Sequence, residues 1–307
     1  MSDLGYVFAA GDGVVGRQAV PLARSIERNH PEAPVYVFVP EDERQEMDPE
    51  VLDALSDVGE ILEGSIPIPD YPISTKIAAL RAAQRVADEP YLAMLDTDML
   101  LLQRLEVESG ADLYLKPVDV GRQFWGRDRS REWWTDLYER YDDRMPDWTV
   151  RSTFDGLEIP PYWNAGVVVT RVDDFGERWL ELTRELHGEI PYDRHADQVA
   201  LGILSTDYEV EVLDDRYNYP IHLRLRCPGD VRVLHYHRKH NLKKVTDRRI
   251  REEMAACGIE VNGSVYTDPG LLFTTVKRYV KRRFLPIDEE HFLERQYLRV
   301  KRVLGSG

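Results

Sequence analysis

An apolar run interrupted by two aspartates constrains the fold of this chain more than any other stretch. Residues 91–102 read YLAMLDTDMLLL. Such a run is typical of a central strand that is buried on both faces of a parallel sheet. Because an unpaired carboxylate inside an apolar layer is costly, Asp96 and Asp98 are expected where the strand ends.

The spacing of the two acids indicates a metal site. One residue separates Asp96 from Asp98, so both side chains point to one face of an extended backbone. Two carboxylates at the carboxyl end of a parallel strand suit a hard divalent cation such as Mg²⁺ or Mn²⁺. A solvated turn between two strands is the alternative, because Asp-x-Asp occurs by chance in many sequences.

Strand-like and helix-like segments alternate along the first part of the chain. The expected strands are 6–10, 35–40, 58–62 and 111–117, and the expected helices are 16–29, 49–56 and 75–87. This alternation is the βαβ pattern of a parallel sheet. The sequence therefore predicts an α/β fold whose first acidic turn follows a central strand.

Four pieces of sequence, in this order, resemble the glycogenin-like retaining glycosyltransferases, glycosyltransferase family eight. They are the helix opening Thr75-Lys76 before the acid pair, Asn164-Ala165-Gly166, Asp197-Gln198, and the strand around His235. The resemblance covers about residues 6–243. It implies a single-domain nucleotide-diphospho-sugar transferase of the GT-A type. Its mixed, mostly parallel sheet would be flanked by helices and followed by a C-terminal helical tail.

The resemblance also implies a set of metal ligands. Asp96, Asp98 and His235 would hold Mn²⁺ or Mg²⁺ on the diphosphate of the donor. His237 shares the strand face of His235 at a period of two and is the alternative third ligand. A lone histidine in such a strand is more often a structural residue than a ligand.

Nucleotide contacts follow from the same resemblance. The residues it places near the nucleotide are Ala10, Gly11, Asp12, Lys76, Asp96, Thr97, Asp98, Lys239 and Lys243. Val14 stands where the family usually has an aromatic residue that stacks on the base, which leaves the base open. From the residues alone, Asp12 is equally a helix N-cap, and Lys76 is equally an exposed helix lysine.

Three residues are expected to act on the sugar. The resemblance places Asn164 and Asp197 beside the donor sugar, with Lys76 assisting at the diphosphate. The family's second aspartate, three residues before Asp197, is replaced by Arg194. An ordinary turn asparagine and a first-turn helix acid are the plainer interpretations of Asn164 and Asp197.

The expected reaction transfers a hexose from a nucleotide diphosphate sugar, preferably a UDP-hexose, to a hydroxyl acceptor on a glycan, glycolipid or protein. The resemblance implies retention of anomeric configuration. One alternative is a non-catalytic sugar- or nucleotide-binding relative, which would be expected to lose a metal ligand. A sugar-phosphate nucleotidyltransferase ranks lower, because only Arg17 follows Gly11-Asp12-Gly13 where that class has an Arg-Lys signature.

Charge is distributed unevenly along the chain. Residues 1–230 contain 23 Lys and Arg against 46 Asp and Glu, whereas residues 231–307 contain 17 against 9. Lys76 and Lys116 are the only lysines among the first 230 residues. This composition resembles that of salt-adapted, halophilic proteins, in which salt screens self-repulsion. The acidity argues against nucleic acid as a partner.

The aromatic-rich stretch 118–160 is expected to combine core and sugar-contacting residues. Trp134 and Leu137 lie at helical spacing and are assigned to the core. Trp125 and Trp148 remain open to a role as a platform for a sugar ring.

Residues 271–307 are expected to form a basic tail separate from a catalytic domain spanning 1–270. Between residues 271 and 304, 9 Lys and Arg against 4 Asp and Glu alternate with aromatic and aliphatic residues. The pattern is typical of interfacial helices and predicts peripheral contact with a membrane. The alternative is that the helices pack on the acidic body. Pro286 is expected to divide the segment in two.

The remaining features indicate a cytoplasmic protein. Met1–Leu4 lacks the basic and apolar regions of a signal peptide, and no stretch is long and apolar enough to span a membrane. Cys227 and Cys257 are the only cysteines and lack metal-ligand spacing, which fits a reducing compartment. A membrane contact would then lie at the inner membrane surface.

Overall fold

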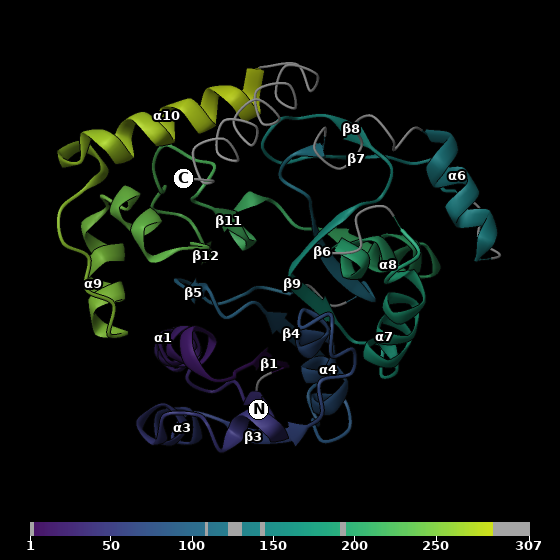
Figure 1. Cartoon of the computed structure of the whole chain (residues 1–307), viewed down its shortest axis with the longest axis horizontal. Coiled ribbons are helices and arrows are strands. Elements are labelled where there is room, and N and C mark those ends of the chain that lie inside the picture. The colour runs from purple at the N-terminus through teal and green to yellow at the C-terminus, as the bar shows by residue number, and fades with distance from the viewer. Residues whose placement is uncertain (1–2, 108–109, 122–130, 142–144, 191–194, 285–307) are drawn as a thin grey trace, which may run out of the picture.

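A seven-stranded mixed sheet forms the centre of the fold (Figure 1). The structure, a computed structural model, describes residues 3–107, 110–121, 131–141, 145–190 and 195–284. The strand order is β10-β6-β9-β4-β1-β2-β3. In chain order the strands are β1 (Leu4–Ala9), β2 (Val35–Pro40), β3 (Glu60–Gly64), β4 (Tyr91–Leu95), β6 (Leu113–Pro117), β9 (Trp163–Thr170) and β10 (Val210–Val212).

Only β9 runs against its neighbours in this sheet. It pairs antiparallel with β4 and with β6, whereas the other neighbouring strands are parallel. The predicted α/β fold with a mixed, mostly parallel sheet is therefore confirmed.

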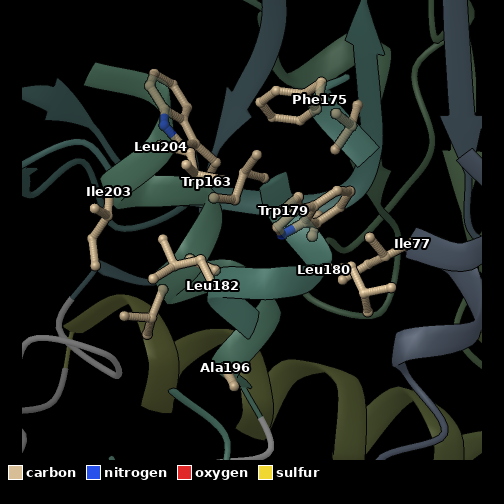
Figure 2. Packing of buried hydrophobic residues seen from close by; sticks show 14 of the residues in the cluster. Ile77, Trp163, Phe175, Trp179, Leu180, Leu182, Ala196, Ile203 and Leu204 are labelled. Atoms are coloured by element: carbon tan, nitrogen blue, oxygen red, sulfur yellow. The ribbon is translucent and has the colours of Figure 1, made fainter. Parts of the chain in front are cut away.

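Helices cover both faces of the sheet. The helices of the described chain are α1 (Gly13–Asn29), α2 (Glu41–Arg44), α3 (Pro49–Ser56), α4 (Ser74–Ala83), α6 (Arg131–Arg140), α7 (Phe175–Leu186), α8 (Ala196–Leu204), α9 (Arg248–Ala256) and α10 (Pro269–Phe284). Of these, α4, α7 and α8 cover one face and α1 and α3 the other. Successive residues of β4 point to opposite faces, so Met94 joins the core under α4, α7 and α8, and Leu95 joins the core under α1 and α3. Figure 2 shows part of the first core, including Ile77, Phe175 and Trp179.

A second, smaller sheet determines where the acidic turn lies. It contains β5 (Met99–Leu101), β12 (Val233–His235) and β11 (Tyr219–Pro220), in the order β11-β12-β5. β12 pairs antiparallel with β5 and parallel with β11. As predicted, the first strand of the apolar run ends at Leu95, but the run continues as β5 in the other sheet. Asp96 and Asp98 therefore lie in the connection between the two sheets.

Short elements complete the described chain. The strands β7 (Val150–Arg151) and β8 (Glu158–Ile159) form an antiparallel pair. The 3₁₀ segments are η2 (Ser205–Asp207), η3 (Asp215–Tyr217), η4 (Lys239–Lys244) and η5 (Val265–Thr267). A third core lies between α9, β11 and β12 and contains both cysteines.

The aromatic-rich stretch is mainly core where the structure describes it. Trp134 and Leu137 are buried, which confirms their assignment. Trp148 is 42% exposed, and its ring centre lies 6.2 Å from that of Trp163. Trp125 lies outside the described residues.

The described part of the C-terminal tail is one helix, α10, which begins at Pro269. Tyr279 packs edge-on against Phe154, and Arg283 Nη1 donates to the Phe154 carbonyl at 2.6 Å. One face of the described part of the tail, residues 271–284, therefore packs on the body. The predicted continuation to residue 304 lies outside the described residues. Among the described helices, none has the length and apolar character to cross a membrane.

Candidate active site

Backbone hydrogen bonds hold the acidic turn between the two sheets. The amide of Asp96 donates to the Gly166 carbonyl of β9 at 2.9 Å. The carbonyl of Asp98 accepts from the Tyr236 amide, just after β12, at 3.0 Å. Because the turn is fixed from both sides, the positions of the two carboxylates are set by the fold.

The turn lines a cavity of about 540 Å³. The cavity wall brings together most of the residues predicted from sequence: Ala10, Gly11, Lys76, Asp96, Thr97, Asp98, Asn164, Asp197 and His235. His237, the alternative ligand, lies in the same wall. Segments far apart in the chain, from β1 to β12, therefore meet at one site.

Asp98 and two histidines form the most compact set of possible metal ligands. Asp98 Oδ1 lies 3.1 Å from His235 Nε2, and Asp98 Oδ2 lies 3.8 Å from His237 Nδ1. One ligand atom from each of the three residues lies within 4.8 Å of the others. The sequence predicted Asp96, Asp98 and His235 as ligands. In the compact set that the structure forms, His237 stands in place of Asp96.

The two histidines differ in their electrostatic surroundings. Burial and the neighbouring His235 ring lower the pKa of His237 to about 3, so its imidazole is neutral near pH 7. Burial also disfavours charge on His235, but the Asp98 carboxylate outweighs burial and raises the pKa of His235. The pKa of Asp98 is lowered, because His235 and His237 offset the cost of burying its charge. A cation could take the place of the proton that this pair shares.

Lys76 lies between two carboxylates. Its Nζ lies 3.1 Å from Asp197 Oδ2 and 3.4 Å from Asp96 Oδ1, and it donates to the Ala165 carbonyl at 2.9 Å. Burial opposes the charge on Lys76, but the two carboxylates outweigh it and raise the lysine's pKa. Burial raises the pKa of Asp96, and Lys76 opposes that rise. The interpretation of Lys76 as an exposed helix lysine is therefore wrong.

Asp197 is buried and held from two sides. Tyr71 donates its hydroxyl to Asp197 Oδ1 at 2.7 Å, and Lys76 contacts the other oxygen. The side chain is only 2% exposed, so the interpretation as a solvated first-turn acid is also wrong. Both carboxylate oxygens have fixed partners at the cavity wall.

Asn164 belongs to a chain of hydrogen-bonded side-chain amides. Its Oδ1 accepts from the Gly166 amide at 2.9 Å and from Asn218 Nδ2 at 3.1 Å. Its Nδ2 donates to Asp119 Oδ2 at 3.2 Å. Asn218 Oδ1 in turn lies 2.9 Å from His235 Nδ1. Asn164 is therefore more than a turn residue, because it is connected to a candidate metal ligand.

The opposite end of the cavity is formed by the turn after β1. The Asp12 amide donates to Glu43 Oε2 at 2.9 Å, and a Cβ at Gly11 would lie 2.1 Å from the same oxygen. Asp12 is the N-cap residue of α1, but its side chain makes no capping hydrogen bond. Asp12 itself is not part of the cavity wall.

The predicted lysines after β12 lie away from the cavity. Lys243 Nζ lies 3.1 Å from Asp268 Oδ2. Lys239 lines a neighbouring cavity of about 680 Å³, which shares His237 with the first. The structure thus does not bring these two lysines to the acid pair.

Sequence reasoning missed several residues of the site, among them Tyr71, Asp119, Asn218 and Glu43. Tyr71 stands in the stretch 66–72, whose three prolines exclude regular structure, although such loops often carry functional residues. Asn218 stands in the segment 215–220, which resembles a Tyr-Asn segment of the family that is expected to be structural. Asp119 and Glu43 had no local signal.

Comparisons with known proteins bear on the family and the fold. The sequence model of the Rhodobacterales glycosyltransferase domain matches residues 6–208. No curated protein matches the chain in sequence.

The galactosyltransferase LgtC, solved with donor and acceptor sugar analogues, superposes with a TM-score of 0.54 at 16% identity, over 86% of this chain and 99% of LgtC. An active-site mutant of LgtC gives 0.52 at 17% identity, over 84% of this chain and 97% of LgtC. The glycosyltransferase GlyE of Streptococcus pneumoniae TIGR4 gives 0.50 at 17% identity over 92% of this chain. This chain spans only 65% of the length of GlyE. At such identities the likeness shows the fold, which is of the LgtC type.

Proposed function

Because the chain belongs to the Rhodobacterales glycosyltransferase domain family, we propose that it transfers a hexose from a nucleotide diphosphate sugar to a hydroxyl acceptor. The observation that carries this proposal is one cavity with two differently built sides. One side has Asp98, His235 and His237, and the other has Lys76, Asn164 and Asp197. A diphosphate would lie at the first side and its sugar at the second.

The residues of the first side fit a divalent metal ion. His237 Nδ1 lies 3.8 Å from Asp98 Oδ2, so this nitrogen could bind the same ion as Asp98 and His235. A carboxylate with two imidazoles suits Mn²⁺ better than Mg²⁺, which prefers oxygen ligands. When bound, the ion would neutralise the charge that develops on the leaving diphosphate. Asp98, His235 and His237 would hold it, with Asp96 close by.

The residues of the second side fit a sugar. Asn164 and the carboxylate of Asp197 offer the acceptors and donors that hydroxyl groups need. Because Tyr71 and Lys76 fix both oxygens of Asp197, this carboxylate would orient the sugar without a large loss of side-chain entropy on binding. Retention of configuration fits an arrangement in which the leaving phosphate accepts the proton of the acceptor. UDP is the preferred nucleotide, and the contacts would come from Ala10, Gly11, Thr97 and Lys76.

A test of the proposed function is a screen of nucleotide sugars for Mn²⁺-dependent hydrolysis. Asp98→Asn should lower the rate about a hundredfold or more, because it removes a charge from the metal-binding side. Asp173→Asn changes an exposed acid of the same charge and should leave the rate unchanged. Full activity of Asp98→Asn, or of the wild type in excess chelator, would contradict the metal-dependent mechanism. Absence of turnover with every nucleotide sugar would favour a non-catalytic binding protein.

A second proposal concerns the C-terminal helix. On α10 the side chains of Phe273, Val276 and Val280 are 70%, 43% and 43% exposed and recur at helical spacing. Lys277 and Lys281 lie beside them in the sequence. We propose that this exposed strip contacts an anionic membrane surface and brings the cavity to a lipid-linked acceptor. The proposal keeps the division into a catalytic domain, 1–270, and a tail, 271–307.

A further inference from the structure

The amides of Asn164 and Asn218 form a relay whose direction is fixed at its ends. The Gly166 backbone amide can only donate, so the atom of Asn164 that faces it must be the oxygen. The Asp119 carboxylate can only accept, so the atom of Asn164 that faces it must be the amide nitrogen. Both ends give the same orientation for Asn164, which therefore does not depend on which side-chain atom is assigned as oxygen.

This orientation determines that of Asn218. Asn164 Oδ1 lies 3.1 Å from one atom of the Asn218 amide, which must therefore be its donating nitrogen. The oxygen of Asn218 then faces His235 Nδ1 at 2.9 Å. An amide oxygen can only accept, so Nδ1 of His235 must carry a proton.

Nδ1 of His235 therefore carries a proton whether the ring is charged or neutral. Nε2 faces Asp98 Oδ1 at 3.1 Å; it donates to that carboxylate when the ring is charged and has the lone pair when the ring is neutral. Nε2 is thus the atom available to a metal ion at the Asp98 side. A histidine that binds a metal generally donates its other ring N–H to an acceptor that fixes the ring and the tautomer.

Burial makes this arrangement rigid. Asn218 is fully buried and His235 is 3% exposed, so a flipped amide would leave polar groups without partners. The far end of the relay is also held, because Asp119 contacts the fully buried Lys116 and accepts from Thr153 at 2.9 Å. These contacts keep the Asp119 carboxylate ionised, as its lowered pKa shows, although burial opposes this.

We propose that Asn218 is a positioning residue that holds His235 in the Nδ1-protonated tautomer and thereby makes Nε2 a metal ligand. The same amide holds Asn164, so one side chain connects the sugar side of the cavity to its metal side. The role of the metal rests on the proposed function. The tautomer does not, and this allows the two to be tested separately.

The test uses two substitutions of Asn218 with different chemistry. Asn218→Leu has a similar size but cannot accept from His235 Nδ1. Asn218→Asp still accepts from Nδ1 but can no longer donate to Asn164. If Asn218 positions His235, Asn218→Asp should keep the tautomer and the Mn²⁺ affinity that Asn218→Leu loses. If Asn218 is only structural, a buried carboxylate should damage the protein at least as much as leucine does.

Two measurements on the full-length protein decide the matter. The first is ¹⁵N NMR of histidine-labelled, metal-free protein, taken to a pH at which the His235 ring is neutral, with His235→Gln used for assignment. Wild type and Asn218→Asp should show protonated Nδ1, and Asn218→Leu should show a mixture. The second is the affinity for Mn²⁺, measured by the EPR signal of the free ion. Asn218→Leu should bind about tenfold or more weakly, and Asn218→Asp within about threefold of wild type.

Asn241→Leu is the matched control. Asn241 is also buried, but its side-chain amide donates to the Tyr236 carbonyl and not to a histidine. It should lower stability without changing the His235 tautomer. Protonated Nε2 in the wild type, or unchanged Mn²⁺ affinity and tautomer in Asn218→Leu, would overturn the proposal. If the wild type binds no Mn²⁺ but has protonated Nδ1, the positioning role stands and the metal-dependent function fails.

Discussion

His237 has a backbone conformation that is rare for residues other than glycine. Its φ is 57°, in the left-handed region, and among the described residues no other non-glycine residue has a positive φ. Its ring is stacked on that of His235, with 3.7 Å between ring centres, and meets the His222 ring edge-on at 3.8 Å. Strain of this kind often accompanies a functional constraint, and here it turns a second imidazole toward Asp98.

The first prediction is that both histidines contribute to metal binding. His237→Asn removes the imidazole but keeps a residue that tolerates the left-handed conformation, so the fold should persist. It should weaken Mn²⁺ binding about tenfold or more, and His235→Asn should weaken it at least as much. Isothermal titration with Mn²⁺ measures both. His240→Asn, in an exposed position of η4, is the control and should bind as the wild type does.

If only His237→Asn lost affinity, His235 would be structural. If only His235→Asn lost affinity, the strained conformation of His237 would need another explanation. The sequence alone ranked His235 first because of the family resemblance. The left-handed conformation of His237 cannot be read from sequence, because position 237 does not hold the glycine or asparagine that usually indicates one.

The individual site residues were predictable to different degrees. Asp96, Asp98, Asn164 and Asp197 stand in short motifs whose order is informative, and the structure brings all four to one cavity. Glu43 reaches the cavity, and Asp119 reaches Asn164, through long-range packing that leaves no local pattern. The lysines 239 and 243 were placed by position in the family, but η4 directs them elsewhere.

At the scale of elements, the site depends on how closely β9 approaches the acidic turn. Gly166 of β9 lies directly beneath the turn, where an added Cβ would be 3.0 Å from Asp96 Oδ2 and 3.0 Å from Asn218 Nδ2. The Met99 side chain would be closer still, at 2.7 Å, but its flexible end can move. Any residue larger than glycine would therefore push apart the two sides of the cavity.

The second prediction follows from this close approach. Gly166→Ala should lower turnover at least about tenfold and destabilise the protein by about 1–3 kcal/mol through overpacking. Urea unfolding and steady-state rates measure the two effects. Gly229→Ala is the control, because its Cβ would meet only Asp247 Oδ2 at an ordinary 3.6 Å. Equal behaviour of the two variants would show that β9 can shift without disturbing the site.

Elements were easier to predict than their pairing. Alternating apolar runs and helical segments located β1, β2, α3, β4 and α4 to within a few residues. The division of residues 91–102 between two sheets was not predicted, because both strands are apolar and only long-range pairing with β12 separates them. The helix expected at 75–87 begins one residue earlier, at Ser74, whose hydroxyl accepts from the Ile68 amide at 3.3 Å and so does not cap the helix.

The third prediction concerns a buried lysine of η4. Lys244 is buried, and its Nζ donates to the carbonyls of Ile221 and His222 at 3.1 Å each. Burial, with a smaller contribution from Arg278 of α10, lowers the pKa of Lys244 to about 8. In the unfolded chain a lysine titrates near 10.4. Between these values the unfolded state binds more protons than the folded state, so stability should rise with pH.

This rise should disappear when the lysine is replaced. The free energy of unfolding of the wild type, relative to Lys244→Met, should increase by about 2 kcal/mol between pH 7 and pH 10, since one pH unit contributes up to about 1.4 kcal/mol. Urea unfolding at both pH values measures the difference. Arg248→Met removes an exposed cation that does not titrate in this range and should give a flat difference. A flat difference for Lys244→Met would mean that its ammonium stays protonated in the core.

At the scale of the whole molecule, the two ends of the chain carry opposite charge. Residues 1–230 have an excess of 23 acidic residues, and residues 231–307 have an excess of 8 basic ones. Part of this complementarity is used within the fold, since Arg232, in the basic part, pairs with Glu106, in the acidic part, at 2.6 Å. Adaptation to high salt, in which screening reduces self-repulsion, stays a prediction from the composition.

The resemblance to glycosyltransferases, which came from four short motifs, is confirmed by the family match, and the GT-A fold by the likeness to LgtC. Charge and composition alone could not have predicted the family or the fold. They argued against nucleic acid as a partner but contained no information on the arrangement of the sheet. The tail was predicted as helical and basic, and the described half of it is both.

The last prediction concerns the exposed strip of α10, defined by Phe273, Val276 and Val280. If it contacts a membrane, full-length protein should sediment with liposomes that contain anionic lipid, and less so with neutral ones. Phe273→Ser/Val276→Ser/Val280→Ser should reduce the bound fraction several-fold, because burial of each side chain contributes about 1.5–3 kcal/mol. High salt should weaken binding only in part, since it screens the cations but not the apolar contact.

The matched control is Leu157→Ser/Leu225→Ser, which removes two apolar side chains that are 39% and 40% exposed elsewhere. Because the inner face of α10 packs on Phe154 through Tyr279, these surface changes should leave the fold intact. Equal sedimentation of the wild type and the triple variant would show that the strip has no part in membrane binding and would leave α10 as a structural helix.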